Sequence, residues 1–169
     1  MIPHPDRQQI AAKCAVITVS DTRTAETDKS GRIIQQLLED AGHQISCYRI
    51  VRDEPSQIEA LLDELERQEA RVIIFSGGTG VAPRDTTYDV VESWLTKIIP
   101  GFGEIFRYLS YREIGSRAIA SRAVAGVRNQ KLLFSLPGSS NAVKLAVTQL
   151  ILPELNHLLS QIEGDKSDR

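Results

Sequence analysis

The chain has 169 residues, of which 41% are hydrophobic, 25% charged and 5% aromatic, and its formal net charge is -2. This length allows one domain with a substantial core, while the near-neutral charge and sparse aromatic residues argue against a nucleic-acid or acidic-membrane surface. The N-terminus (MIPHPDRQQI) lacks the apolar segment of a signal peptide, and no apolar run reaches membrane-spanning length. We therefore expect a cytoplasmic protein with neither nucleic-acid nor membrane partners.

The first half of the chain alternates short apolar runs with segments of helical periodicity. The lead-in over residues 1–12 is polar, and we expect it to be solvated. The apolar runs predict buried strands, and they span residues 14–19, 45–51 and 71–76. Asp28 is expected to cap a first helix that stops at Gly42. A capping box of Ser56 and Glu59 is expected to begin the second helix.

The second half continues the alternation. We expect a helix that Thr86 or Thr87 caps and that runs through Trp94. Pro100 and Gly101 then break the chain. The remaining predicted elements are a helix at 102–114, two extended runs at 123–127 and 131–136 that form a hairpin or an extended pair, and a helix at 142–152.

This order of elements predicts a single α/β domain. Strand–helix–strand units with short connections are right-handed crossovers, which make neighbouring strands parallel and cover the sheet with helices. The domain is expected to span residues 13–162, with a flexible tail at 163–169. The fold class is therefore α/β with a mainly parallel sheet.

Cysteine and histidine spacing argue against a disulfide framework and a zinc site. Cys14 and Cys47 lie in apolar strand-like runs, so we expect buried, reduced thiols. The histidines at positions 4, 43 and 157 show no mutual spacing typical of zinc ligands. The sequence has no Gly-x-Ser-x-Gly elbow, so a hydrolase triad has no anchor.

A glycine-rich turn follows the third predicted strand and leads into a polar cluster. Glycines let backbone N–H groups approach an oxyanion without a Cβ in the way. Glycines alone would suit a plain strand-to-helix connection, but the Arg-Asp-Thr-Thr cluster has little use in one. The spacing matches neither a P-loop nor a dinucleotide fingerprint. The predicted phosphate contacts are Gly77, Gly78, Thr79, Gly80, Arg84 and Thr87.

Two carboxylates are expected at the same end of the sheet. Asp85 lies in the polar cluster, and Asp53 follows the second predicted strand. A carboxylate beside a phosphate repels it unless a divalent cation bridges the two. Asp85 and Asp53 are therefore candidate catalytic residues and candidate Mg²⁺ ligands, although Asp53 alone would be read as a solvated loop acid.

A second turn of small residues follows the last predicted strand and leads into a helix, as the first turn does. Because ligands of open α/β sheets bind outside the carboxyl ends of strands, we expect the two turns to converge on one site. Ser20, at the end of the first strand, is a further candidate contact. The candidates in the second turn are Pro137, Gly138, Ser139 and Ser140.

Several separated motifs agree in order and spacing with one known family. They are ITVSD at 17–21, D-x-SG at 28–31, GGTG-x-x-x-RD-x-T-x-D at 77–89, GFGE at 101–104, RAVAG at 122–126 and PGS at 137–139. Together they resemble the MoaB/Mog family of molybdenum-cofactor biosynthesis proteins over about residues 13–160, and the likeness is closest to the MoaB branch.

The resemblance implies a three-layer α/β/α sandwich and a homo-oligomer, either a trimer or a hexamer. Active members bind molybdopterin and ATP and, with Mg²⁺, transfer AMP to the terminal phosphate of the pterin, releasing pyrophosphate. Asp85 and Asp53 match family acids, and Gly77–Gly80 with Ser139 match phosphate or pterin contacts. A phosphate nucleophile is already anionic, so this reaction needs positioning and charge neutralisation more than a general base. A molybdenum-insertion enzyme is a candidate partner.

Three positions depart from the family pattern. Tyr88 stands where proline is frequent, Asp89 where glutamate is frequent, and Asn141 where lysine is frequent. Without the lysine, an anion loses a charge-assisted hydrogen bond worth roughly 1.5–3 kcal/mol. Three functions stay open: an adenylyltransferase, a non-catalytic molybdopterin-binding or carrier protein, and an oligomeric scaffold with a vestigial site. Asp85 and Thr87 favour the first.

Overall fold

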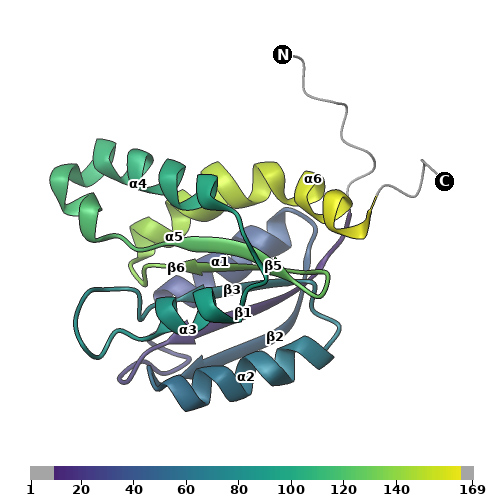
Figure 1. The fold of residues 1–169 in the computed structure, drawn as a ribbon, viewed down its shortest axis with the longest axis horizontal. Coiled ribbons are helices and arrows are strands. Elements are labelled where there is room, and N and C mark those ends of the chain that lie inside the picture. The colour runs from purple at the N-terminus through teal and green to yellow at the C-terminus, as the bar shows by residue number, and fades with distance from the viewer. Residues whose placement is uncertain (1–9, 165–169) are drawn as a thin grey trace.

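The computed structural model describes residues 10–164 and has a six-stranded sheet between two layers of helices (Figure 1). The strands are β1 (Lys13–Val19), β2 (Gln44–Val51), β3 (Val72–Ser76), β4 (Lys97–Ile98), β5 (Val124–Arg128) and β6 (Lys131–Leu136). Their order is β2-β1-β3-β6-β5-β4. The first four in this order pair in parallel, while β5 is antiparallel to both of its neighbours. The predicted sandwich with a mainly parallel sheet is confirmed.

The helices cover the two faces of the sheet unequally. They are α1 (Lys29–Asp40), α2 (Pro55–Arg67), α3 (Thr87–Trp94), α4 (Pro100–Ile114), the 3₁₀ segment η1 (Gly115–Ala120), α5 (Ser140–Ala146), the π-helical segment η2 (Val147–Ile151) and α6 (Leu152–Glu163). One face carries α2 and α3, and the other carries α1, α4, α5 and α6 (Figure 1). None of the helices within residues 10–164 is long and apolar enough to cross a membrane.

Side chains of the central strands alternate between two hydrophobic cores. Cys14 and Val16 point to the core under α1 and the C-terminal helices, whereas Ala15 and Ile17 point to the core under α2 and α3. A strand buried on both faces is mostly apolar, which is why β1 reads as an apolar run, and its buried Thr18 is satisfied by a hydrogen bond to Asp28. Cys14 is buried as predicted, but Cys47 is only half-buried, because β2 is an edge strand; both thiols are free.

The starts of α1 and α2 differ in how they are capped. The carboxylate of Asp28 accepts a 3.0 Å hydrogen bond from the backbone N–H of Gly31, which confirms the predicted cap of α1. The capping box predicted at Ser56 is wrong, since α2 already begins at Pro55 and its N-cap residue makes no side-chain hydrogen bond. Proline suits a first helical position because its φ is preset and its missing N–H would be unpaired there anyway.

The structure refines three expectations in the second half. Thr86 occupies the N-cap position of α3, but its side chain makes no capping bond. The extended pair is a hairpin, whose two turn residues, Asn129 and Gln130, both have positive φ, as tight hairpin turns require. The exposed two-residue strand β4 was not predicted, since so short a segment carries no periodicity.

The ends of the described chain are more ordered than expected. Ala12 is buried, and the backbone N–H of Ile10 donates a 3.2 Å hydrogen bond to Asn156. The helix expected to end at residue 152 continues through η2 and α6, so Glu163 is helical and forms an ion pair with Arg71. The rest of the predicted lead-in and tail, 1–9 and 165–169, lies outside the described residues.

Candidate functional site

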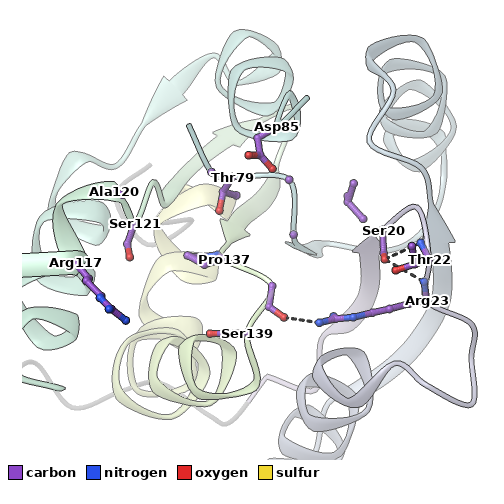
Figure 2. A pocket seen from close by; sticks show the side chains of 15 residues that line it. Ser20, Thr22, Arg23, Thr79, Asp85, Arg117, Ala120, Ser121, Pro137 and Ser139 are labelled. Atoms are coloured by element: carbon purple, nitrogen blue, oxygen red, sulfur yellow. Dashed lines mark hydrogen bonds between the residues drawn. The ribbon is translucent and has the colours of Figure 1, made fainter. Parts of the chain in front are cut away.

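A pocket of about 570 Å³ opens at the carboxyl ends of β1, β3 and β6, three neighbouring parallel strands (Figure 2). Its residues are Val19, Ser20, Thr22, Arg23, Gly77, Gly78, Thr79, Gly80, Asp85, Arg117, Ala120, Ser121, Pro137, Gly138 and Ser139. The two glycine turns therefore meet at one pocket, as their positions after strands predicted. A volume of this size suits a small-molecule ligand.

The two turns lie directly against each other. A Cβ built on Gly138 would stand 3.1 Å from the Cα of Gly77, which is tighter than side-chain atoms normally approach backbone. Gly77 itself has a φ of 105° and donates its N–H to the carbonyl of Leu136 at 2.9 Å. The close approach explains why both turns need glycine here, and it makes the pocket floor from backbone.

Asp53 lies behind the glycine turn and does not line the pocket. It is buried, and its Oδ1 accepts hydrogen bonds from the backbone N–H of Thr86 (3.1 Å) and from its hydroxyl (2.8 Å). The buried hydroxyl of Thr87 donates a third bond, at 3.1 Å. Asp53 thus anchors the chain just after Asp85, and the Thr86 hydroxyl is directed to this carboxylate and makes no bond to the backbone of α3.

Asp85 is the carboxylate that reaches the pocket. Figure 2 shows it above Thr79, on the rim of the pocket. Its Oδ2 accepts a 3.1 Å hydrogen bond from the backbone N–H of Ala82, and a Cβ built on Gly80 would stand 2.5 Å from the same oxygen. The carboxylate is therefore packed against the glycine turn while keeping access to a ligand.

Arg84 and Ser20 hold local structure. Arg84 does not line the pocket; its Nε donates to Asp21 at 2.7 Å and its Nη2 to Glu54 at 3.1 Å. The hydrogen bond from Arg84 is the main reason that the pKa of the Asp21 carboxyl is lowered. Ser20 does line the pocket, and its Oγ accepts hydrogen bonds from the N–H groups of the following loop at 3.1 and 3.2 Å (Figure 2).

Of the other predicted contacts, some line the pocket and some lie outside it. Pro137, Gly138 and Ser139 line the pocket, and the Oγ of Ser139 accepts a 3.2 Å hydrogen bond from the N–H of Ala142 as the N-cap of α5. Ser140 does not line the pocket, and neither does the buried Thr87. The structure thus brings most of the predicted residues to one cleft, with Asp53, Arg84, Thr87 and Ser140 around it.

Two arginines that sequence reasoning did not select line the outer walls. Arg23 reaches in from the loop after β1 and donates its Nη2 to the carbonyl of Gly138 at 3.1 Å. Arg117 comes from η1, and its guanidinium points toward the pocket (Figure 2). Because Arg23 lies in the loop after a predicted strand, the sequence could have indicated it as a pocket residue. Arg117 follows no strand, so nothing in the sequence indicated it. These two guanidinium groups and the Asp85 carboxylate make the lining mixed in charge, and the guanidinium groups can bind anionic parts of a ligand.

The donor set suits a magnesium ion that arrives with a phosphate substrate. Within residues 10–164, no three His, Cys, Asp or Glu side chains are grouped so that they could hold a metal ion. Mg²⁺ is usually bound through one or two carboxylates, waters and substrate phosphates and not by an all-protein cage. Asp85 fits that mode because it is the carboxylate on the pocket lining.

Known proteins are similar in sequence to this chain over almost its whole length. Residues 15–157 match the family model described as a probable molybdopterin binding domain. Molybdenum cofactor biosynthesis protein B of Halalkalibacterium halodurans is 54% identical over 156 residues, covering 91% of this chain and 92% of that protein. The protein of the same name from Bacillus subtilis is 49% identical over 165 residues, covering 96% and 97%.

Solved structures share the fold. A crystal structure of molybdenum cofactor biosynthesis protein B superposes with a TM-score of 0.89 at 45% identity, covering 94% of this chain and 100% of that one. The tungsten cofactor synthesizing protein MoaB from Pyrococcus furiosus gives 0.82 at 36% identity, covering 90% and 97%. The glycine turns, the sheet around them and these likenesses agree: the chain belongs to the molybdopterin-binding MoaB/Mog family of molybdenum cofactor biosynthesis proteins.

Proposed function

We propose that this chain transfers AMP from ATP to the terminal phosphate of molybdopterin. Its family acts in molybdenum cofactor biosynthesis, and the adenylyl transfer is the step that the pocket supports best. The observation that carries the proposal is Asp85 on the rim of a pocket with a backbone floor and with Arg23 and Arg117 in its walls. Such a pocket suits two anionic substrates and a divalent cation between them.

The chemistry requires little of the protein beyond placement. A phosphate oxygen of the pterin attacks the α-phosphorus of ATP and forms a new P–O bond. The bond from that phosphorus to the α–β bridging oxygen breaks, and pyrophosphate leaves with the electron pair. Because the attacking phosphate is already ionised, no protein base has to remove a proton, so catalysis rests on positioning and charge stabilisation.

The residues of the pocket divide these tasks. Gly77–Gly80 offers backbone N–H groups that no side chain shields, and the guanidinium groups of Arg23 and Arg117 attract the anionic substrates. Asp85 would hold the Mg²⁺ that accompanies the triphosphate, and that ion would offset the negative charge where the two phosphates meet. Asp53 keeps this acid in place through its three hydrogen bonds to the next two residues.

The test is direct assay of the wild-type protein and of Asp85→Asn. With molybdopterin and MgATP, the wild type should yield adenylylated pterin and pyrophosphate. Asp85→Asn should remain folded and lose turnover. Asp63→Asn, an exposed acid on α2, is the control and should keep turnover. Calorimetric pterin binding without ATP consumption would select the carrier function instead, and folded wild type that binds neither compound would leave only the scaffold.

The homo-oligomer implied by the family likeness is part of this proposal. Large apolar side chains on α4 and η1 are at least half exposed in the single subunit. Contact with a second subunit would remove them from water. They are Ile105, Tyr108, Tyr111, Ile114 and Ile119. Light scattering on the eluting protein should give the mass of a trimer or hexamer. The cytoplasmic location and an insertion-enzyme partner stay predictions.

A further inference from the structure

One guanidinium group donates hydrogen bonds to several backbone carbonyls in and just after the glycine turn. Arg122 follows η1 and is joined to residue 121, which lines the pocket. Its Nε donates to the carbonyl of Thr79 at 3.1 Å, and its Nη2 donates to the carbonyls of Gly80 at 2.8 Å and Asp85 at 3.3 Å. The two ends of the segment that carries the acid are therefore attached to one side chain.

The start of α3 fixes the same guanidinium from another side. Asp89 accepts two hydrogen bonds from Arg122, one at 2.9 Å from Nη1 and one at 3.1 Å from Nη2. The guanidinium carbon also lies 4.7 Å from the centre of the Tyr88 ring. A paired carboxylate and an aromatic face restrict the orientation of the planar fork. Tyr88 and Asp89, two of the departures from the family pattern, thus both serve to orient Arg122.

Apart from the bonds of Arg84 to Asp21 and Glu54, few contacts restrain the outer part of this segment. Residues 81–84 are exposed, and Val81 keeps 75% of its surface accessible. Asp53 anchors the segment at its end, and Arg122 supplies the contacts at its beginning. Arg122 is the side chain that joins the carbonyls of Thr79 and Gly80 directly to that of Asp85, so its loss would remove the link that fixes the acid relative to the start of the segment.

We propose that Arg122 is a positioning residue that sets the place of Asp85 relative to the glycine turn. It does not line the pocket, so it acts through Asp85 and Gly80 and not on the substrate. The consequence for turnover rests on the proposed adenylyl transfer, whereas the consequence for the segment does not. Lysine cannot replace it, because one ammonium group cannot reach three carbonyls and a carboxylate in the fixed geometry of the fork.

The chain contains a matched control at the other end of β5. Arg128 also lies over an aromatic ring, 5.0 Å from the centre of Trp94. It donates its Nε to Glu66 at 2.9 Å and its Nη1 to the carbonyl of Trp94 at 3.0 Å. The exposed fractions of the two side chains are similar, 27% and 33%. Arg128 therefore has the same kinds of contact without any connection to the pocket.

The experiment compares Lys and Ala variants of both arginines. Hydrogen exchange of residues 79–86 in the free protein, molybdopterin affinity by calorimetry, kcat and KM for adenylylation, and stability in urea would be measured for each. Both sets should lose stability. Only Arg122→Lys and Arg122→Ala should exchange faster in this segment, and their kcat should fall by at least about tenfold, as misplacement of a reacting group predicts.

Unchanged exchange and kcat in Arg122→Ala would overturn the positioning role, and so would an equal loss of kcat in Arg128→Ala. The exchange measurement needs no turnover, which separates this inference from the proposed function. If the wild type lacks transferase activity but the Arg122 variants alone exchange faster and bind molybdopterin more weakly, the proposed transfer fails while the positioning role is supported.

Discussion

The hydroxyl of Tyr48 donates a 2.7 Å hydrogen bond to the carboxylate of Asp28, which joins β2 to the N-terminus of α1. The hydroxyl of Thr18 donates to the same carboxylate oxygen at 2.6 Å. Asp28 is fully buried and lies 3.6 Å from Arg23, the residue that holds the carbonyl of Gly138. A buried charge thus connects the edge of the sheet to the second turn of the pocket.

Replacing Tyr48 with Phe should show how much the stabilisation by the Asp28 carboxylate depends on its hydrogen-bond donors. Burial would raise the pKa of Asp28, but hydrogen bonds from Thr18, Gly31 and Tyr48 outweigh it and lower the pKa. The carboxylate therefore stabilises the fold above its unfolded pKa, and this stabilisation is lost as the pH falls through the folded value. Tyr48→Phe should cost about 1–2 kcal/mol near neutral pH and begin its acid unfolding at higher pH.

Urea unfolding at several pH values measures both effects. Ser56→Ala, which removes an exposed hydroxyl on α2, is the control and should stay within about 0.5 kcal/mol of the wild type. Equal behaviour of the two variants would contradict a role for the Tyr48 hydroxyl.

A methyl group at Gly78 should damage the site. Gly78 has a φ of 64°, and a Cβ there would collide with the Thr87 hydroxyl and the Asp53 carboxylate. Gly78→Ala should cost at least about 2 kcal/mol and weaken pterin binding, since the turn must move. Gly101→Ala is the counterpart in α4, where a Cβ meets nothing within 4 Å, and it should be neutral or stabilise by about 0.5–1 kcal/mol. Thermal unfolding and calorimetry would check both, and a neutral Gly78→Ala would refute the steric account.

Substitutions of Asp53 and Asp85 should differ in their effect on stability, although both should abolish turnover. Asp53→Ala leaves three donors on Thr86 and Thr87 without their acceptor and should cost about 1–3 kcal/mol. Asp85→Ala loses one hydrogen bond at a partly exposed position and should cost less than about 1.5 kcal/mol. Both variants should lose adenylylation. Chemical denaturation alongside the assay gives the two readings, and a larger stability loss for Asp85→Ala would reverse the assigned roles.

His43 should make the stability of the fold pH-dependent between neutral and mildly acidic conditions. Its Nδ1 accepts a 3.3 Å hydrogen bond from the backbone N–H of Ala12, and burial lowers the pKa of the imidazole. The unfolded chain therefore takes up a proton more readily, so stability is complete above the unfolded pKa of about 6.5 and falls as the pH drops below it.

His43→Asn should remove this part of the pH dependence, because an amide keeps an acceptor without titrating in this range. Denaturant midpoints from pH 5 to 8 would decide, and an unchanged profile in His43→Asn would count against the prediction.

Most of the fold could be predicted because its signals are local. The strands β1, β3 and β6 are buried on both faces, so each is a mostly apolar run that needs no tertiary information to recognise. The start of α2 was misplaced because Ser56 and Glu59 form a plausible pair in sequence, although Pro55 already begins the helix. The strand β4 exists only through its pairing with β5, which the sequence does not display.

The site was predictable to the extent that strand ends and glycines mark it. The convergence of Gly77–Gly80 with Pro137–Ser139 follows from parallel strands alone. Arg84 was predicted to contact phosphate, which requires that no carboxylate of the protein pairs with its guanidinium. In the fold, Asp21 and Glu54 both accept hydrogen bonds from it. Arg122 lies 42 positions beyond Gly80, so only the folded chain reveals that they touch.

The pocket is formed by two kinds of residue, those that contribute main chain and those that contribute side chains, and this difference matters for protein engineering. Its floor is main chain from two turns, whereas its outer walls are side chains. Arg23 belongs to both, since it also holds the carbonyl of Gly138. A library that varies Thr22, Arg117 and Ser121 while keeping Arg23 would reshape the walls over an unchanged floor, so new ligand preferences could be selected without rebuilding the scaffold.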